Sequence, residues 1–83
     1  MITSPFVGTF YRAAQPGADP FVKVGDAVDP GQTVAIVEAM KLMNQVQADV
    51  KGTVAEILLE DGQWVEFEQV LMYVEPAGSE EPG

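Results

Sequence analysis

Lysine is the residue of this sequence best suited to covalent chemistry, because the 83 residues contain neither histidine nor cysteine. Without these two residue types the chain cannot build a zinc finger, a cysteine nucleophile, a Ser-His-Asp triad or a disulfide framework. Carboxylates, lysines, tyrosines and hydroxyl groups remain, from which a small enzyme could be built, although it would be unusual. We expect no metal site. Among the three lysines, Lys41 stands apart because large apolar residues surround it, Met40 before it and Leu42 and Met43 after it.

The segment that contains Lys41, Glu38-Ala39-Met40-Lys41-Leu42-Met43, conflicts with the pattern on either side of it. Strand-like alternation precedes and follows it, so the chain must reverse direction here, yet the segment has none of the usual turn residues. Conflicts of this kind tend to mark functional sites. At a hairpin tip the apolar side chains cannot all be buried, and an exposed apolar rim indicates docking. The alternative is that Lys41 is an ordinary surface lysine and the methionines fill the core.

The elements that position this segment are short runs of strand-forming residues with a period of two. Glycine, proline and aspartate separate these runs, and no helical stripe is sustained anywhere. We therefore predict an all-β fold, a small sandwich or flattened barrel. We expect Phe10, Tyr11 and Trp64 to pack inside it. The clearest strand-like runs are Val34–Glu38, Val54–Leu59, Trp64–Phe67 and Val70–Val74.

The chain also repeats itself once. Residues 25–38 resemble residues 62–75 at an offset of 37, whereas Gly8-Thr9 resembles Gly52-Thr53 at an offset of 44. The first half therefore carries seven extra residues, which we place within 12–20. Two similar halves predict quasi-two-fold symmetry, with each half covering the core of the other, and Lys41 lies at the midpoint between them. The alternative is coincidence between turn-rich strands.

Length and charge limit the number of domains and the kinds of binding partner. The chain is long enough for one domain, which we assign to residues 1–76, followed by a disordered C-terminal tail at 77–83. The net charge of −9 argues against nucleic-acid binding. No apolar run approaches the roughly 18 residues of a membrane span, and the first residues do not resemble a signal peptide. The lack of cysteine fits a reducing compartment.

At this point the residues support a resemblance to a known family. Glu38–Met43 resembles the biotinylation signature of biotin carboxyl carrier domains, whose core is Ala-Met-Lys followed by Met or Leu. Ser4–Arg12, Phe21–Val28 and Gly62–Glu66 resemble the carrier protein of multi-subunit acetyl-CoA carboxylase, so the likeness covers nearly the whole chain. It implies two four-stranded antiparallel sheets, with the modified lysine on a tight hairpin and a protruding thumb loop.

The resemblance implies a function for Lys41. A biotin–protein ligase would attach biotin there and would recognise the tip residues Glu38, Ala39, Met40 and Leu42. The domain would then carry carboxybiotin from a biotin carboxylase subunit to carboxyltransferase subunits, in the first committed step of fatty acid synthesis. It would be a non-catalytic carrier, because the cofactor supplies the chemistry and the protein supplies its position. Bacterial cytoplasm is the expected compartment, with plastid stroma as the alternative.

The resemblance also implies that the thumb touches biotin, although a tolerated surface loop would have the same composition. Family thumbs often begin with Thr-Pro, whereas Ala13-Ala14 stand here and offer no hydroxyl. Two other functions stay open: a carrier domain of another biotin-dependent carboxylase, and a lipoyl domain, whose lysine usually follows Asp rather than Met40. An unmodified interaction domain is a third. The thumb residues are Arg12, Ala13, Ala14, Gln15, Pro16, Gly17, Ala18, Asp19 and Pro20.

Overall fold

β-branched and aromatic residues form strands in this chain, and Gly, Pro and Asp residues end them. The computed structural model describes residues 1–77 and contains no helix within them, as the sequence predicts. Ala77 is described, and the rest of the predicted tail lies outside the described residues. The strands are β1 (Ile2–Thr3), β2 (Gly8–Tyr11), β3 (Ala27–Val28), β4 (Thr33–Ala39), β5 (Leu42–Gln47), β6 (Gly52–Ile57), β7 (Gln63–Val65) and β8 (Val70–Pro76).

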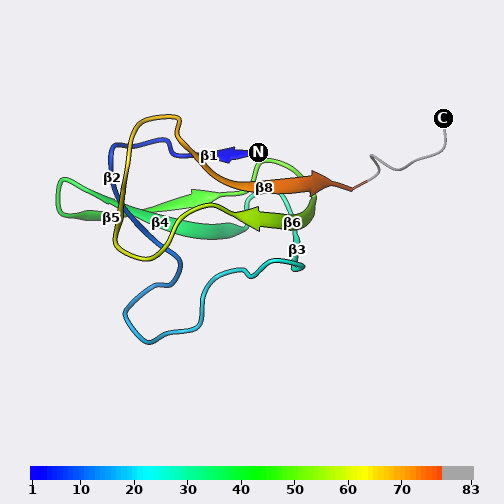
Figure 1. Cartoon of the computed structure of the whole chain (residues 1–83), viewed down its shortest axis with the longest axis horizontal. Coiled ribbons are helices and arrows are strands. Elements are labelled where there is room, and N and C mark those ends of the chain that lie inside the picture. The colour runs from blue at the N-terminus through cyan, green and yellow to red at the C-terminus, as the bar shows by residue number, and fades with distance from the viewer. Residues whose placement is uncertain (78–83) are drawn as a thin grey trace.

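The strands form two four-stranded antiparallel sheets, which confirms the predicted fold class. One sheet has the order β1-β8-β6-β3 and the other has the order β5-β4-β2-β7. Exchanging β1 with β5, β2 with β6, β3 with β7 and β4 with β8 turns one order into the other. The predicted quasi-two-fold symmetry is therefore present in the topology. Figure 1 shows the β4–β5 hairpin at the left end of the molecule and the end of β8 at the right.

Matched hydrogen bonds confirm the symmetry at the level of single residues. The amide of Gly25 donates to the carbonyl oxygen of Val54, and the amide of Gly62 donates to that of Phe10, both at 2.8 Å. The amide of Glu66 donates to Oε1 of Gln69 at 2.9 Å, and in the first half the amide of Asp29 donates to Oε1 of Gln32 at 3.1 Å. The repeat seen in the sequence thus reflects a repeated structure.

The core lies between the two sheets and is built from both halves. Phe10 and Leu71 are fully buried there, so the expectation for Phe10 is confirmed. Tyr11 is half-buried. The expectation that Trp64 packs in the core is wrong, because 58% of its surface is exposed. Trp64 lies on the edge strand β7, and its side chain faces solvent rather than the core between the two sheets.

Glu68 occupies a backbone conformation that glycine occupies in the other half. Its φ is 66°, and its symmetry mate Gly31 has a φ of 87°. A non-glycine residue in this left-handed region costs about 1–2 kcal/mol. We expect Glu68→Gly to raise the free energy of unfolding by about 0.5–1 kcal/mol, after the entropy that glycine adds to the unfolded chain. Urea denaturation measures the change, and Glu66→Gly, outside this region, should lower stability. Equal effects of the two variants would contradict the argument.

The seven extra residues of the first half form a protruding loop, as predicted. In the second half the chain passes from the end of β6 to β7 in a few residues, whereas in the first half it makes an excursion below β2 (Figure 1). The amide of Phe21 donates to the carbonyl oxygen of Arg12 at 2.8 Å and closes the loop at its base. Within the loop, Ala13 is buried. We call residues 12–20 the thumb.

Candidate functional site

Lys41 lies at the tip of a two-residue hairpin. Ala39 of β4 pairs directly with Leu42 of β5, so Met40 and Lys41 alone make the turn. Their φ values are 53° and 66°. Turns of this kind need a positive φ at both central positions, because their twist then matches that of the strands. The predicted reversal of the chain at Lys41 is confirmed, and it occurs without any of the residues that normally favour it.

The side chains around this tip point into solvent. Met40 is 94% exposed, Leu42 is 64% exposed, and Met43 and Lys41 are exposed as well. Asn or Gly at the first turn position would fit the backbone better than methionine. Met40 therefore costs stability and buries nothing. A methionine that costs stability and buries nothing is best explained by recognition, which agrees with the apolar rim expected from the sequence.

Replacing Met40 separates stability from recognition. We expect Met40→Asn to raise the free energy of unfolding by about 1 kcal/mol, because asparagine tolerates a positive φ. The resemblance of Glu38–Met43 to the biotinylation signature predicts that the same variant is modified at Lys41 more slowly by a biotin–protein ligase. Urea denaturation and initial rates of modification measure the two effects. A variant that is less stable, or that is modified at the wild-type rate, would contradict the role given to Met40.

Two polar side chains hold the hairpin in shape. Nδ2 of Asn44 donates to the carbonyl oxygens of Val37 at 3.3 Å and Leu42 at 3.1 Å, which ties the two strands together just below the turn. The hydroxyl of Tyr11 on β2 donates to Oε1 of Glu38 at 3.5 Å. Neither role was predicted from the sequence. Asparagine is depleted in strands, so its presence in β5 was the available signal.

The thumb and the hairpin enclose a shallow groove of about 190 Å³. The thumb contributes Ala13–Pro16, and Glu38 and Met43 contribute from the hairpin, with Tyr11 between them. The structure therefore brings the first part of the thumb to the predicted tip. The other thumb residues do not line this groove: Arg12, Gly17, Ala18, Asp19 and Pro20. At the base of the thumb, the amide of Arg12 donates to Oδ1 of Asp61 at 2.6 Å.

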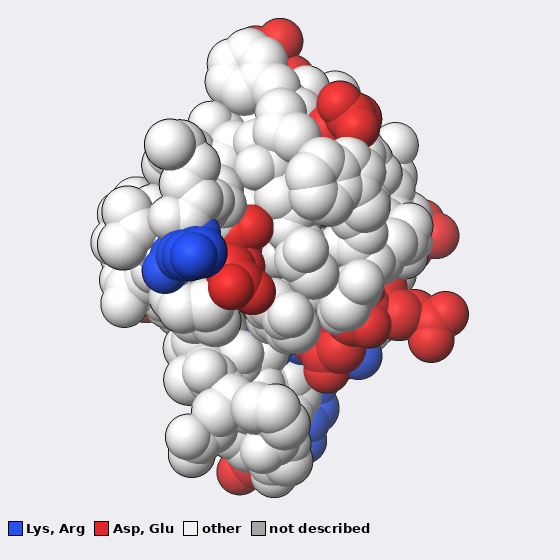
Figure 2. Space-filling model, turned by 90° about the vertical axis from the view of Figure 1, so that its left-hand side faces the viewer, with Lys and Arg blue, Asp and Glu red and all other residues white. Residues whose placement is uncertain are grey.

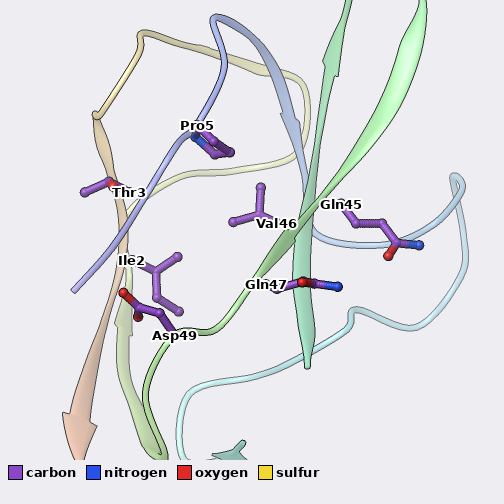
Figure 3. Close-up of a pocket in the computed structure, with 7 residues that line it drawn as sticks. All are labelled: Ile2, Thr3, Pro5, Gln45, Val46, Gln47 and Asp49. Carbon is purple, nitrogen blue, oxygen red and sulfur yellow. The ribbon is translucent and has the colours of Figure 1, made fainter. Parts of the chain in front are cut away.

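A second hollow of about 180 Å³ lies between the edge strands β1 and β5, away from the turn. Figure 3 shows Ile2 and Thr3 on one side of it and Val46 and Gln47 on the other. These residues are symmetry mates, Ile2 of Val46 and Thr3 of Gln47, so the hollow lies at the seam of the two sheets. Its only ionisable side chain is Asp49. We assign it no chemistry.

Among the described residues the single ion pair joins Nζ of Lys51 to Oδ1 of Asp29 at 4.0 Å, so the Lys41 amine is not engaged in one. Figure 2 views the hairpin end, where most of the surface is uncharged, one basic side chain lies directly beside an acidic group, and further acidic groups lie towards the edges. Residues 1–77 contain no group of three metal-binding side chains and no helix that is long and apolar enough to cross a membrane.

Comparisons with curated proteins find close relatives of one kind. The chain is 57% identical over 75 residues to the biotin carboxyl carrier protein of acetyl-CoA carboxylase from Nostoc sp. strain PCC 7120, covering 90% of this chain and 41% of the relative. It is 53% identical to the Pseudomonas aeruginosa protein of that name, covering 89% and 47%. A chloroplastic relative from Arabidopsis thaliana is 52% identical, covering 90% and 27%. The chain thus spans less than half the length of these relatives.

The structural and family comparisons point the same way. The crystal structure of Kluyveromyces lactis urea carboxylase superposes with a TM-score of 0.76 at 32% identity, over 89% of this chain and 6% of that one. The model of the Biotin_lipoyl family, described as "Biotin-requiring enzyme", matches residues 1–74. That match includes both sheets, the thumb and the Lys41 hairpin. The chain therefore belongs to the Biotin_lipoyl family of biotin-requiring enzymes.

Proposed function

We propose that this chain is the biotinyl domain of a biotin carboxyl carrier protein of acetyl-CoA carboxylase, with biotin attached to Lys41. The observation that carries the proposal is the exposed lysine on a two-residue turn, within the sequence Glu38–Met43. An amine at such a tip can enter the active site of another enzyme, and the sheets behind it need not move. The names of the relatives support acetyl-CoA carboxylase as the parent enzyme.

In this proposal the chain holds and presents the cofactor and catalyses nothing itself. A biotin–protein ligase would take the proton from the Lys41 ammonium, and the free amine would attack biotinyl adenylate, which forms the amide and releases AMP. The ligase would recognise Glu38, Ala39, Met40 and Leu42 beside the lysine. Lys41 would hold biotin as an amide, and the bound cofactor would supply carboxyl-group transfer between a biotin carboxylase subunit and carboxyltransferase subunits, in the first committed step of fatty acid synthesis. Tethering raises its concentration at both sites to roughly millimolar.

The residues around Lys41 fit an attached biotin. The Lys41 amine is free of ion pairs in the described residues, and the groove beside it is lined mainly by alanine, proline, methionine and tyrosine side chains. A mostly apolar groove with a few polar atoms is the usual surface for a small organic ligand. We infer that Ala13–Pro16 of the thumb contact the biotin ring, through packing rather than through a hydroxyl group.

Deleting the thumb tests this contact. Residues 14–20 have no counterpart in the second half, which folds without them, so their deletion should preserve the fold. We expect the deletion variant to be biotinylated at the wild-type rate, while the attached biotin becomes more mobile. NMR relaxation of the isotope-labelled biotin arm measures that mobility. Unchanged relaxation would mean that the thumb does not touch the ring.

The second candidate for the parent enzyme is another biotin-dependent carboxylase, which the match to urea carboxylase supports. A lipoyl role has less support, because Met40 stands where lipoyl domains usually have Asp. We infer from the bacterial and chloroplastic relatives that the domain works in a bacterial cytoplasm or a plastid stroma. We also infer that it binds neither nucleic acid nor membrane, given its net charge of −9.

A reconstitution distinguishes the two parents. The biotinylated domain is supplied as the only source of biotin, either to the biotin carboxylase and carboxyltransferase subunits of an acetyl-CoA carboxylase or to a urea carboxylase lacking its own carrier domain. Transfer of ¹⁴C from bicarbonate to the final acceptor measures the outcome. We expect kcat/KM to be at least about tenfold higher with the acetyl-CoA carboxylase subunits. Preference for the urea carboxylase would reverse the assignment, and no transfer in either system would refute it.

A further inference from the structure

Four apolar side chains form an exposed strip that the hairpin site does not use. Phe67 is 61% exposed, Trp64 is 58% exposed, and Val7 and Phe6 are 44% and 39% exposed. They come from β7, from the loop after it and from the segment before β2. We call these four residues the aromatic edge. Large exposed aromatic side chains gathered in one place are unusual on a small acidic domain and indicate an interface.

The aromatic edge lies at the same end of the molecule as Lys41. Thr9 of β2 pairs with Glu38 on one side and with Trp64 on the other, so Trp64 and the hairpin lie in one row across the sheet. From β5 to β7 this row spans three strand spacings, about 14 Å. Figure 1 shows the loops before β2 and after β7 at the left end, with the β4–β5 turn.

The internal symmetry shows that the fold does not require these side chains. The mate of Trp64 is Ala27, which pairs with Thr53 as Trp64 pairs with Thr9. The mate of Val7 is Lys51. The mates of Phe67 and Phe6 are Pro30 and Val50. The same backbone is thus built twice, and the half-turn of symmetry replaces the four side chains of the aromatic edge by Ala27, Lys51, Pro30 and Val50.

The aromatic edge is also held in place before any partner binds. The hydroxyl of the fully buried Ser4 donates to the carbonyl oxygen of Phe6 at 2.6 Å. The amide of Glu68 donates to the carbonyl oxygen of Ser4 at 2.7 Å, which joins the two loops. Nε1 of Trp64 donates to Oε2 of Glu66 at 2.6 Å. A preorganised surface loses less entropy on binding, so it is suited to recognition.

We propose that the aromatic edge docks onto the biotin carboxylase subunit, at an apolar surface with a rim of lysine and arginine. This inference rests on the proposed function. Charge complementarity supports it, because Glu66 and Glu68 flank Phe67, both are exposed, and the chain carries a net charge of −9. The same net charge opposes pairing with a second copy of this chain.

The chemistry of the partners favours the biotin carboxylase over the other two enzymes. Its co-substrates, ATP and bicarbonate, are both anions that react beside biotin, so the entrance to its active site must be cationic. A carboxyltransferase binds the phosphates of coenzyme A a pantetheine length away from the reacting acyl group. A ligase needs the Lys41 amine itself and therefore contacts the hairpin. An enzyme that binds only the end of the biotin arm can also contact the surface around the hairpin, which includes the aromatic edge.

The test compares the double variant Trp64→Ala, Phe67→Ala with the control Tyr73→Ala, which removes an exposed aromatic residue from the other sheet. The first readout is the Kd of each unbiotinylated domain for an isolated biotin carboxylase subunit at two salt concentrations. The second is kcat/KM for carboxylation of the biotinylated domains, with free biotin as a reference substrate. Intact mass confirms biotinylation separately, so failure of the proposed function is distinguished from failure of this inference.

We expect the double variant to bind at least about tenfold more weakly and to lose kcat/KM by a similar factor. We expect Tyr73→Ala to behave as wild type and high salt to weaken wild-type binding. Wild-type values in a fully biotinylated double variant would overturn the proposal. A loss of activity in the double variant that is confined to ligation or to carboxyl transfer would also overturn it, because the aromatic edge would then bind the ligase or the carboxyltransferase. A wild-type dimer that dissociates in the double variant would overturn it as well, because the edge would then bind a second copy of this chain.

Discussion

Gly8→Ala is expected to remove most of the stability of the fold, an effect that among single added methyl groups only Gly52→Ala should match. A Cβ added to Gly8 would collide with the carbonyl oxygen of Glu38 and would stand 3.0 Å from Cγ1 of Val37. Neither obstacle can yield easily, because one is backbone and the other is a core side chain. We expect a loss of about 3 kcal/mol or more, which is most of the stability of a domain of this size.

The symmetry of the fold supplies both a replicate and a control. Gly52, the mate of Gly8, would drive its Cβ into the carbonyl oxygen of Glu75, so Gly52→Ala should be as damaging. Gly31 has open space around it and a φ of 87°, so Gly31→Ala should cost only about 1 kcal/mol. Circular dichroism with urea denaturation measures all three. A Gly8→Ala variant as stable as Gly31→Ala would show that β2 and β4 do not approach as described.

Lys41→Arg is expected to abolish carboxyl carriage and leave the fold intact. Arginine keeps the charge and tolerates the exposed position, but its guanidinium group is not a nucleophile at neutral pH and cannot form the amide. We expect no detectable ¹⁴C transfer in the reconstituted system. The melting temperature should stay within about 2 °C of wild type, because the side chain makes no ion pair among the described residues.

Lys23→Arg and Lys51→Arg are the matched controls for this variant. Both lysines are exposed, as Lys41 is, but neither lies on the hairpin, since Lys23 precedes β3 and Lys51 precedes β6. We expect both variants to carry carboxyl groups at the wild-type rate. Activity that persisted in Lys41→Arg, or that disappeared in either control, would place the attachment point elsewhere.

The sequence was informative about the fold because two halves that share a backbone also share turn residues. Gly25 and Gly62 both have a positive φ, and the side chains of Gln32 and Gln69 both accept a hydrogen bond from a nearby amide. These requirements are local, so they appear directly as residue types. The difference between the two offsets then located the thumb, because an insertion in one half leaves the other half as its reference.

The site was predictable in position but not in detail. The hairpin at Lys41 followed from the repeat, although a turn of Met and Lys violates every turn preference. The hydrogen bonds from Asn44 and the groove beside the thumb depend on the packing of distant segments, which no local pattern reports. Trp64 was misjudged because large aromatic residues usually contribute to a core. Comparison with its small mate Ala27 already indicated that no core space was reserved for it.

Peptide mapping by mass spectrometry after incubation with a biotin–protein ligase, biotin and ATP tests the central claim most directly. A single addition of about 226 Da on Lys41, the mass of biotin joined through an amide, is the predicted result, with Lys23 and Lys51 unmodified. An unmodified Lys41 or an addition on another lysine would contradict the claim. So would an addition of about 188 Da, the mass of a lipoyl group, when the domain is instead produced in cells that supply both cofactors.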